Sequence, residues 1–194
     1  MSSIAYNASI QQHAPVSIDA DALPAINVKD VKLAHFIKAY PQYAPLVESL
    51  ASMVEPRRYL SVSVHVTNFQ TCKRSCLDTG WHLDGKMNRN EPEQYALICF
   101  GPDGTRTMFH QHSFDSNAVK TAPSDMEGRR ELFTHILGHD LHDESKGFEV
   151  GNGVPITYTT FDFHKGRIAN NGRRVFIRVM SSNVIRHKAL KRRS

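Results

Sequence analysis

Long apolar runs, a cysteine framework and a secretory leader are all missing from this sequence. The 194 residues contain no run of about 18 apolar side chains, so a membrane-spanning helix is excluded. The three cysteines, Cys72, Cys76 and Cys99, form an odd set and predict reduced thiols rather than disulfides. Residues 1–21 are polar, with no basic stretch followed by an apolar core. We expect a soluble, cytoplasmic protein without a membrane partner.

Acidic residues are missing from the end of the chain. The formal net charge is +5, and residues 186–194 hold five Lys and Arg residues, so the other 19 balance the 19 Asp and Glu residues. A short terminal run of charge is usually solvated. The alternative is a weak contact between this basic tail and the phosphates of a nucleic acid.

The N-terminal part of the chain has helical periodicity. Between residues 28 and 53, apolar side chains recur mostly at intervals of three and four, and Pro41 and Pro45 divide the pattern into two helices. We therefore predict a helical N-terminal layer over residues 1–57.

The periodicity changes to that of β-strands from residue 58 onward. Side chains alternate over 59–66 and 156–163, and apolar runs occupy 95–100 and 175–180. The Gly101–Gly104 turn predicts that 105–109 returns beside 95–100 as a hairpin, and Ser124 predicts the cap of a helix over 124–137. The sequence thus predicts one domain over 1–194, mainly β with flanking helices, whose sandwich or barrel core spans 58–181 and whose basic tail spans 182–194.

Metal-ligand residues occur at a spacing that suits a strand. His82 and Asp84 are two residues apart, so on an extended segment both side chains point to the same face. His164, which ends another alternating segment, is the candidate for a third ligand from a distant strand. Two imidazoles and one carboxylate that leave coordination positions open suit non-haem Fe(II) oxygenases.

Arginines follow the third candidate ligand. Arg174 and Arg178 share one face of the predicted strand after Gly172, whereas Arg173 faces the other way. A guanidinium inside a small β fold is costly unless an anion meets it, and its planar fork suits a carboxylate.

These residues give the chain a resemblance to the 2-oxoglutarate/Fe(II)-dependent oxygenase superfamily. Its pattern is His-x-Asp, a long interval, a second His and then a basic residue about ten positions later, and it corresponds here to His82, Asp84, His164 and Arg174. The resemblance implies a double-stranded β-helix, which is the jelly-roll core also found in cupins. It further implies an enzyme that binds Fe(II), 2-oxoglutarate and O₂ and hydroxylates a C–H bond.

The resemblance also implies an anchor for the far carboxylate of 2-oxoglutarate. Arg174 is the first choice, Arg173 and Arg178 are the competing choices, and Tyr95 is a candidate for the hydroxyl that joins the anchor. The substrate to be oxidised, whether a small molecule, a protein or a nucleic acid, is not identified by the sequence.

Two further groups of ligand-type residues and two other functions stay open. Cys72 and Cys76 could form half of a zinc site, and residues 139–144 are rich in His and acids, although a solvated loop is the favoured interpretation there. The alternative functions are a non-catalytic β module that binds nucleic acid or a protein, and a cupin-like metal dioxygenase that uses no 2-oxoglutarate.

Overall fold

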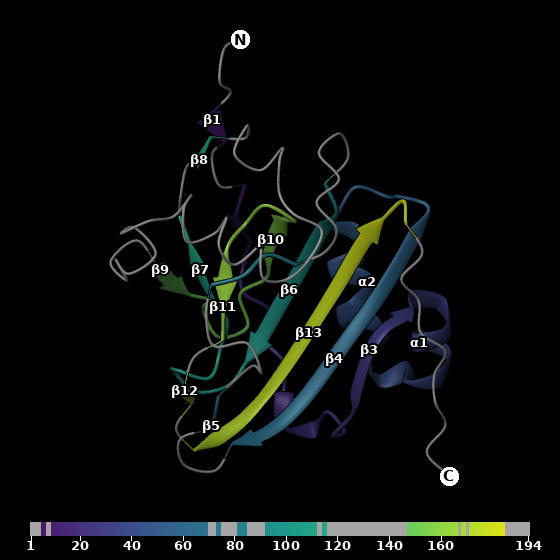
Figure 1. Ribbon diagram of the computed structural model, residues 1–194. Helices are drawn as coiled ribbons and strands as arrows, with labels where there is room; N and C mark the ends of the chain where they lie inside the picture. Colours follow the sequence, from purple (N-terminus) through teal and green to yellow (C-terminus); the bar gives the residue numbers. More distant parts are fainter. Residues whose placement is uncertain are drawn as a thin grey trace.

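The structure is a computed structural model, and it describes residues 5–6, 9–69, 73–74, 81–84, 92–111, 114–115, 147–166, 168–169 and 171–184. Two β-sheets face each other and two α-helices flank the larger one (Figure 1). The elements are β1 (Ala5–Tyr6), β2 (Gln11–Gln12), η1 (Ala20–Ala22), β3 (Asn27–Lys32), α1 (Leu33–Ala39), η2 (Pro41–Tyr43), α2 (Ala44–Ser52), β4 (Tyr59–Phe69), β5 (Lys73–Arg74), β6 (Gln94–Phe100), β7 (Met108–His110), β8 (Phe114–Asp115), β9 (Gly147–Glu149), β10 (Ile156–Thr159), β11 (His164–Lys165), β12 (Ile168–Ala169) and β13 (Gly172–Ser182).

The larger sheet has the strand order β2-β10-β6-β13-β4-β3, and the smaller has the order β11-β7-β9. Neighbouring strands in both sheets pair antiparallel. The long strands β4 and β13 pair in register from Tyr59 opposite Ser182 to Phe69 opposite Gly172. The two-stranded pairs β1-β8 and β5-β12 complete the described strands.

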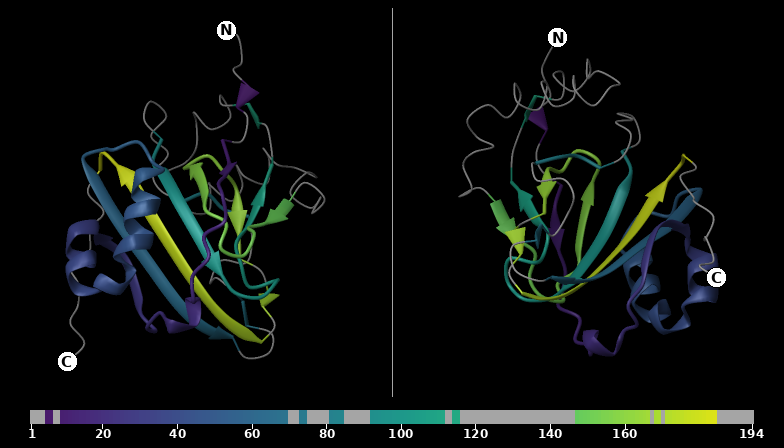
Figure 2. Two further views of the ribbon diagram at one scale, coloured as in Figure 1. Left: turned by 180° about the vertical axis from the view of Figure 1, so that it is seen from behind. Right: turned by 60° about the horizontal axis from the view of Figure 1, so that its bottom comes forward.

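The outer face of the larger sheet carries the helices. Helices α1 and α2 lie together against this face, on the side of β4 and β13 (Figure 2). An apolar core fills the space between the helices and the sheet. Its buried members include Phe36, Tyr43, Val47, Leu50, Val62, Val64, Ile98, Val175, Ile177 and Val179.

The inner face of the larger sheet packs against the smaller sheet through a second apolar cluster. Tyr95 and Leu97 of β6 meet Phe109 of β7 and Tyr158 of β10 in this cluster. The rings of Tyr95 and Tyr158 stack with centroids 4.9 Å apart, and the Tyr158 and Phe109 rings meet edge to face at the same separation. The inner cluster therefore joins the two sheets.

The N-terminal layer is only partly helical. The two predicted helices form and are separated at Pro41, as α1 and α2. Residues 28–32, in contrast, were expected in the first helix and instead belong to β3, so that prediction is wrong. Val28 pairs with Val64 and Val31 with Val62 on β4, because the β-branched side chains gain sheet partners and outer-core contacts at this edge.

The prediction that residues 105–109 return beside β6 as a hairpin is also wrong. Residues 108–110 form β7, which pairs with β9 and β11 of the smaller sheet rather than with β6. The intervening turn is fixed to other strands: a Cβ at Gly101 would lie 2.9 Å from the carbonyl oxygen of Arg173, and the Arg106 guanidinium donates to the carbonyl of Val150 at 2.7 Å. These contacts direct the chain across to the smaller sheet.

The remaining strand predictions agree with the structure except at one end. Strands β4, β6 and β13 cover 59–66, 95–100 and 175–180, and β10 covers the start of 156–163, where Thr160 to Phe163 form a turn and its continuation. The fold class, mainly β with flanking helices, is confirmed. The helix predicted over 124–137 lies outside the described residues. Within the described part of the chain, every helix is too short or too polar to cross a membrane.

Candidate metal centre

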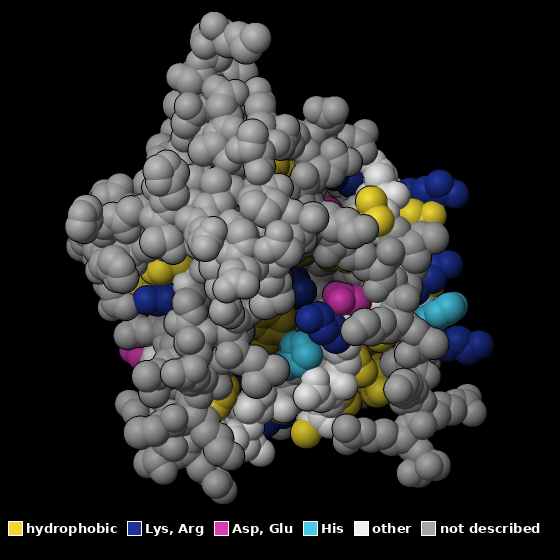
Figure 3. All heavy atoms as spheres, in the orientation of Figure 1, with side chains coloured by type: hydrophobic (Ala, Val, Ile, Leu, Met, Phe, Trp, Pro, Cys, Tyr) yellow, Lys and Arg dark blue, Asp and Glu magenta, His cyan; other side chains and the backbone are white. Residues whose placement is uncertain are grey.

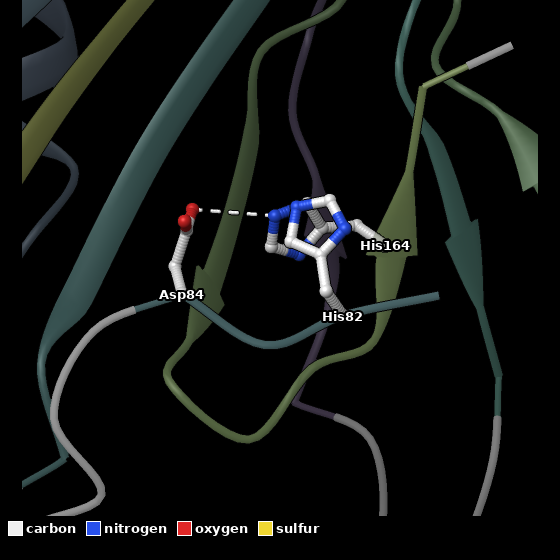
Figure 4. Close-up of side chains that lie close together, drawn as sticks. All are labelled: His82, Asp84 and His164. Atoms are coloured by element: carbon white, nitrogen blue, oxygen red, sulfur yellow. Dashed lines mark ion pairs between the residues drawn. The ribbon is translucent and has the colours of Figure 1, made fainter. Parts of the chain in front are cut away.

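Backbone pairing brings the predicted ligands together. His82 and His164 form an isolated antiparallel bridge in which each backbone N–H donates to the carbonyl of the other residue, at 3.0 and 3.1 Å. Directly opposed residues of an antiparallel pair project to the same side, and Asp84 follows two residues after His82. The three side chains therefore lie on one side of the same short ribbon (Figure 4).

Strand alternation also accounts for the other side of this ribbon. Trp81 directly precedes His82, and Lys165 directly follows His164. The Lys165 ammonium lies 4.6 Å from the centre of the Trp81 ring. The Trp81 ring meets His110 edge to face at 4.9 Å. Trp81 thus packs beside the ligand-bearing segment.

The three ligands form one cluster. One potential ligand atom from each of His82, Asp84 and His164 lies within 4.8 Å of the other two. At metal–ligand distances of about 2.1 Å, adjacent ligand atoms of an octahedral ion are about 3 Å apart. The separation of 3.2 Å between Nε2 of His164 and Oδ2 of Asp84 is close to that value. The prediction that these residues meet at metal-binding distance is confirmed.

The imidazole of His164 is oriented from behind. Its Nδ1 lies 3.1 Å from the backbone carbonyl oxygen of Asp162, and a carbonyl can only accept, so Nδ1 carries the hydrogen. Nε2 is then the nitrogen that faces Asp84. This arrangement, with one ring nitrogen held by an acceptor and the other aimed at the ligand cluster, is the usual one for a metal-binding histidine.

Asp84 is held by an arginine and a tyrosine. Nη1 of Arg178 donates to Oδ2 of Asp84, and the hydroxyl of Tyr158 donates to the same oxygen at 3.3 Å. Burial alone would raise the pKa of Asp84. The positive charge of Arg178 and the neighbouring imidazole of His164 outweigh burial and hold the pKa of this carboxyl well below its usual range. Asp84 is therefore a carboxylate at neutral pH, as a metal ligand must be.

Arg178 is enclosed by aromatic rings. Its guanidinium carbon lies 5.3 Å from the centre of the Tyr95 ring and 5.9 Å from that of Phe176. A cation over an aromatic face is stabilised by the quadrupole of the ring. Arg178, which the sequence offered as a competing anchor for 2-oxoglutarate, thus lies directly beside the candidate metal ligands.

Arg174 lies on the same face of β13, four residues from Arg178. It is 7% exposed, and its guanidinium carbon lies 5.4 Å from the ring centre of Phe69 and 5.5 Å from that of Phe176. Nη1 donates to the carbonyl of Thr105 at 3.3 Å. The structure therefore places both arginines on the inner face, with Phe176 between them.

The other two predicted site residues have different surroundings. Arg173 points to the outer side, where it donates to the carbonyls of Ala20 and Leu23, so it is removed from the inner face as alternation predicts. Tyr95 is buried on the inner face, and its hydroxyl donates to Oε2 of Glu93 at 2.7 Å. These contacts link Tyr95 to Glu93 and to Arg178, the competing anchor.

Tyr158 and Asp162 are site residues that sequence reasoning missed. Alternation over 156–163 places Tyr158 on a strand face, but it contains no sign that this face meets Asp84, which lies 74 positions earlier.

The zinc candidates Cys72 and Cys76, the cluster at 139–144 and the basic tail at 186–194 lie outside the described residues.

The donor set fits a first-row divalent metal. Two imidazole nitrogens and one carboxylate oxygen converge from one side, which suits Fe(II) as well as Mn(II) or Zn(II). Histidine, acidic and basic side chains are visible together in a hollow near the middle of the molecule (Figure 3).

Comparison with protein-family models, with curated proteins and with solved structures finds no match to this chain.

Proposed function

We propose that this protein is an Fe(II)- and 2-oxoglutarate-dependent dioxygenase that hydroxylates a C–H bond of its substrate. The observation that carries the proposal is the cluster of His82, Asp84 and His164 on one side of a β-ribbon. Three ligands on one side leave the remaining coordination positions for a chelating co-substrate and O₂.

The order of the strands supports a double-stranded β-helix as the scaffold. The larger sheet has six strands, of which β2 and β3 lie at its two edges and β4, β6, β10 and β13 form the central four. The facing group of four is β7, β9, β11 and the segment at His82, which pairs with His164 of β11. The chain passes repeatedly from one group to the other. Eight strands in two facing antiparallel sheets are the composition of a jelly roll.

The two inner-face arginines support a dicarboxylate as the co-substrate. Arg178 contacts Asp84, so its guanidinium lies beside the metal ligands, whereas the far carboxylate of 2-oxoglutarate is three carbon–carbon bonds beyond its 2-oxo carbon. Arg174, four residues along the same strand face, is therefore the better partner for the far carboxylate. Arg178 holds Asp84 and limits the near end of the co-substrate site.

In this reaction the iron would supply the activation of O₂ and the oxidation of the substrate. One oxygen atom ends in the carboxylate of succinate and the other in the new hydroxyl group, while 2-oxoglutarate loses CO₂. The contribution of the chain is positional. Arg178 and Tyr158 orient the Asp84 carboxylate, the carbonyl of Asp162 orients His164, and the aromatic inner cluster limits access of water from the side of the sheet.

The test is 2-oxoglutarate binding to the anaerobic Fe(II) protein. Chelation should produce a visible metal-to-ligand band that saturates with 2-oxoglutarate, and admission of O₂ should then release succinate. A protein that binds Fe(II) without such a band would be either a cupin-like dioxygenase that needs no 2-oxoglutarate or a non-catalytic binding module, and O₂ consumption with substrate would distinguish the two. A protein that binds no iron would be assigned to the non-catalytic binding modules.

A further inference from the structure

A second carboxylate lies behind the candidate metal centre and is not part of the ligand set. Asp162 is 1% exposed and follows β10 in the turn that leads to His164. Its Oδ2 accepts from the backbone N–H of Thr159 at 2.7 Å and from the Thr159 hydroxyl at 3.1 Å. The Asp162 side chain therefore closes the turn between β10 and β11.

The same carboxylate is joined to the N-terminal segment. The backbone N–H of Ser9 donates to Oδ1 of Asp162 at 2.9 Å, and the Ser9 hydroxyl donates to Oδ2 at 2.5 Å. From Ser9 the chain continues along the edge of the larger sheet, where β2 pairs with β10. Backbone bonds from His13 to Pro155 and from Val16 to Gly153 extend this attachment. Ser9 thus fixes one end of an N-terminal strap, residues 9–16, to the turn.

The backbone of Asp162 faces the metal centre. Its carbonyl oxygen lies 3.1 Å from Nδ1 of His164, two residues further along the chain. The side chain and the carbonyl belong to one residue, so a shift of the turn moves the acceptor of the imidazole. The strap and the ligand are thereby connected through a single buried residue.

We propose that Asp162 is a positioning residue of the metal centre, and that Ser9 assists it by holding the Asp162 carboxylate. The inference rests on the metal site of the proposed function, and it is independent of 2-oxoglutarate and of the oxidation. Partners behind a metal-bound histidine commonly change metal affinity by about 10- to 100-fold when they are lost.

Asp162→Asn is an informative variant because it keeps the size of the side chain. An amide nitrogen in the place of Oδ1 would face the N–H of Ser9, and in the place of Oδ2 it would face the N–H of Thr159. Either orientation leaves one backbone N–H opposite a donor, so the turn must shift. Ser9→Ala is a milder second variant, since it removes the hydroxyl that contacts Asp162 and Thr159 and keeps the backbone N–H that donates to Asp162.

Glu149→Gln is the matched control. The Glu149 carboxylate also accepts from two backbone N–H groups, those of Gly104 and Arg106, at 2.9 to 3.1 Å. Glu149 lies on β9 and bonds the turn after β6, where it also forms an ion pair with Arg106 at 3.6 Å. The control therefore changes the same chemistry at another turn of the same protein.

The experiment combines Co(II) titration of the full chain with proton NMR of the metal-free protein. Asp162→Asn should weaken Co(II) binding about 10-fold and alter the visible Co(II) spectrum, and Ser9→Ala should act in the same direction with a smaller effect. The two changes together should weaken binding by less than the product of the single effects, because they act through one contact. Glu149→Gln should bind Co(II) like the parent.

The NMR readout separates the two proposals. The His164 ring N–H, assigned by its loss in His164→Gln, should exchange with water faster in Asp162→Asn than in the parent, with or without metal. Parental Co(II) affinity in Asp162→Asn, or an equal loss in Glu149→Gln, would overturn the positioning role. Should the parent bind no Co(II), the proposed function fails, and an unchanged ring N–H exchange in Asp162→Asn would then overturn the positioning role as well.

Discussion

The two faces of β13 differ in chemistry although one stretch of backbone carries both. Val175, Ile177 and Val179 point outward into the apolar core beneath the helices. The alternate positions Arg174, Phe176 and Arg178 point inward, toward the candidate metal centre. One strand therefore supplies both a stabilising surface and a charged surface.

The inward face is positive as well as polar. His65, which lies opposite Phe176 on β4, has its pKa lowered to about 4 by burial and then by the charges of Arg178 and Arg174. Among the described residues of this face, the Asp84 carboxylate is the acid that pairs with Arg178. Between residues 174 and 179 of β13, the outer face therefore contributes apolar side chains to the core under the helices, and the inner face contributes positive charge that suits an anionic ligand.

The largest expected effect is at the ligands of the inner face. His82→Ala, Asp84→Ala and His164→Ala should each abolish tight Fe(II) or Co(II) binding, because each removes one of three protein ligands. Circular dichroism should show that the β fold remains. Titration calorimetry measures the binding, and a variant that binds like the parent would remove that residue from the site.

The opposite result is expected on the outer face. Ile177 is fully buried, so Ile177→Ala should lower the free energy of unfolding by about 2 to 5 kcal/mol. Metal affinity should be unchanged at temperatures where the variant is folded. Urea unfolding and Co(II) titration of the same preparation check both statements, and a loss of metal affinity below the unfolding transition would show that the two faces are not independent.

Arg174 tests the charge of the inner face. A charge-assisted bond to a carboxylate is worth about 1.5 to 3 kcal/mol, so Arg174→Ala should weaken 2-oxoglutarate binding by roughly 10- to 150-fold and spare Fe(II). Arg174→Lys should give an intermediate value, because it keeps the charge and loses the planar fork. The visible band of the anaerobic Fe(II) complex reports the affinity.

Arg173 and Arg178 are the controls for this experiment. Arg173→Ala should leave 2-oxoglutarate affinity unchanged, since its side chain bonds the N-terminal segment on the outer side. If Arg178→Ala still bound Fe(II) but lost 2-oxoglutarate, and Arg174→Ala retained both, the anchor would move to Arg178. No effect in either variant would contradict the co-substrate assignment.

His65 makes the charge of the inner face visible as a pH dependence of stability. Its pKa falls from 6.5 to about 4 on folding, so between these values the unfolded chain binds a proton that the folded protein does not. Its contribution to stability is therefore complete above pH 6.5 and is lost as the pH falls toward 4. In urea unfolding at several pH values, His65→Asn should flatten the dependence of stability on pH over this interval.

The smallest effect on the site is expected from the basic tail. Deletion of residues 186–194 should leave 2-oxoglutarate turnover without substrate intact and should reduce the salt dependence of oligonucleotide binding. Turnover is measured as succinate release, and binding is measured by fluorescence anisotropy at several salt concentrations. A truncated protein with the salt slope of the parent would contradict a role of the tail in binding.

The sequence by itself determined the features that depend on local periodicity. Alternation predicted the strands around β4 and β13, the spacing of His82 and Asp84 predicted a shared face, and Pro41 predicted the break between the helices. These features follow from the backbone geometry of a strand or helix over a few residues, so they can be inferred without knowing what packs nearby.

The ligand pattern predicted that His164 would join His82 and Asp84, but only the tertiary structure decided which other distant segments meet. The sequence could not show that Arg178, 94 positions from Asp84, would contact its carboxylate, or that Ser9 would reach Asp162 across 153 positions. The same limit explains why residues 28–32 form a strand and why β7 joins the smaller sheet. Pairing between remote strands depends on register and on the competition among all available partners, and neither is contained in the periodicity of one segment.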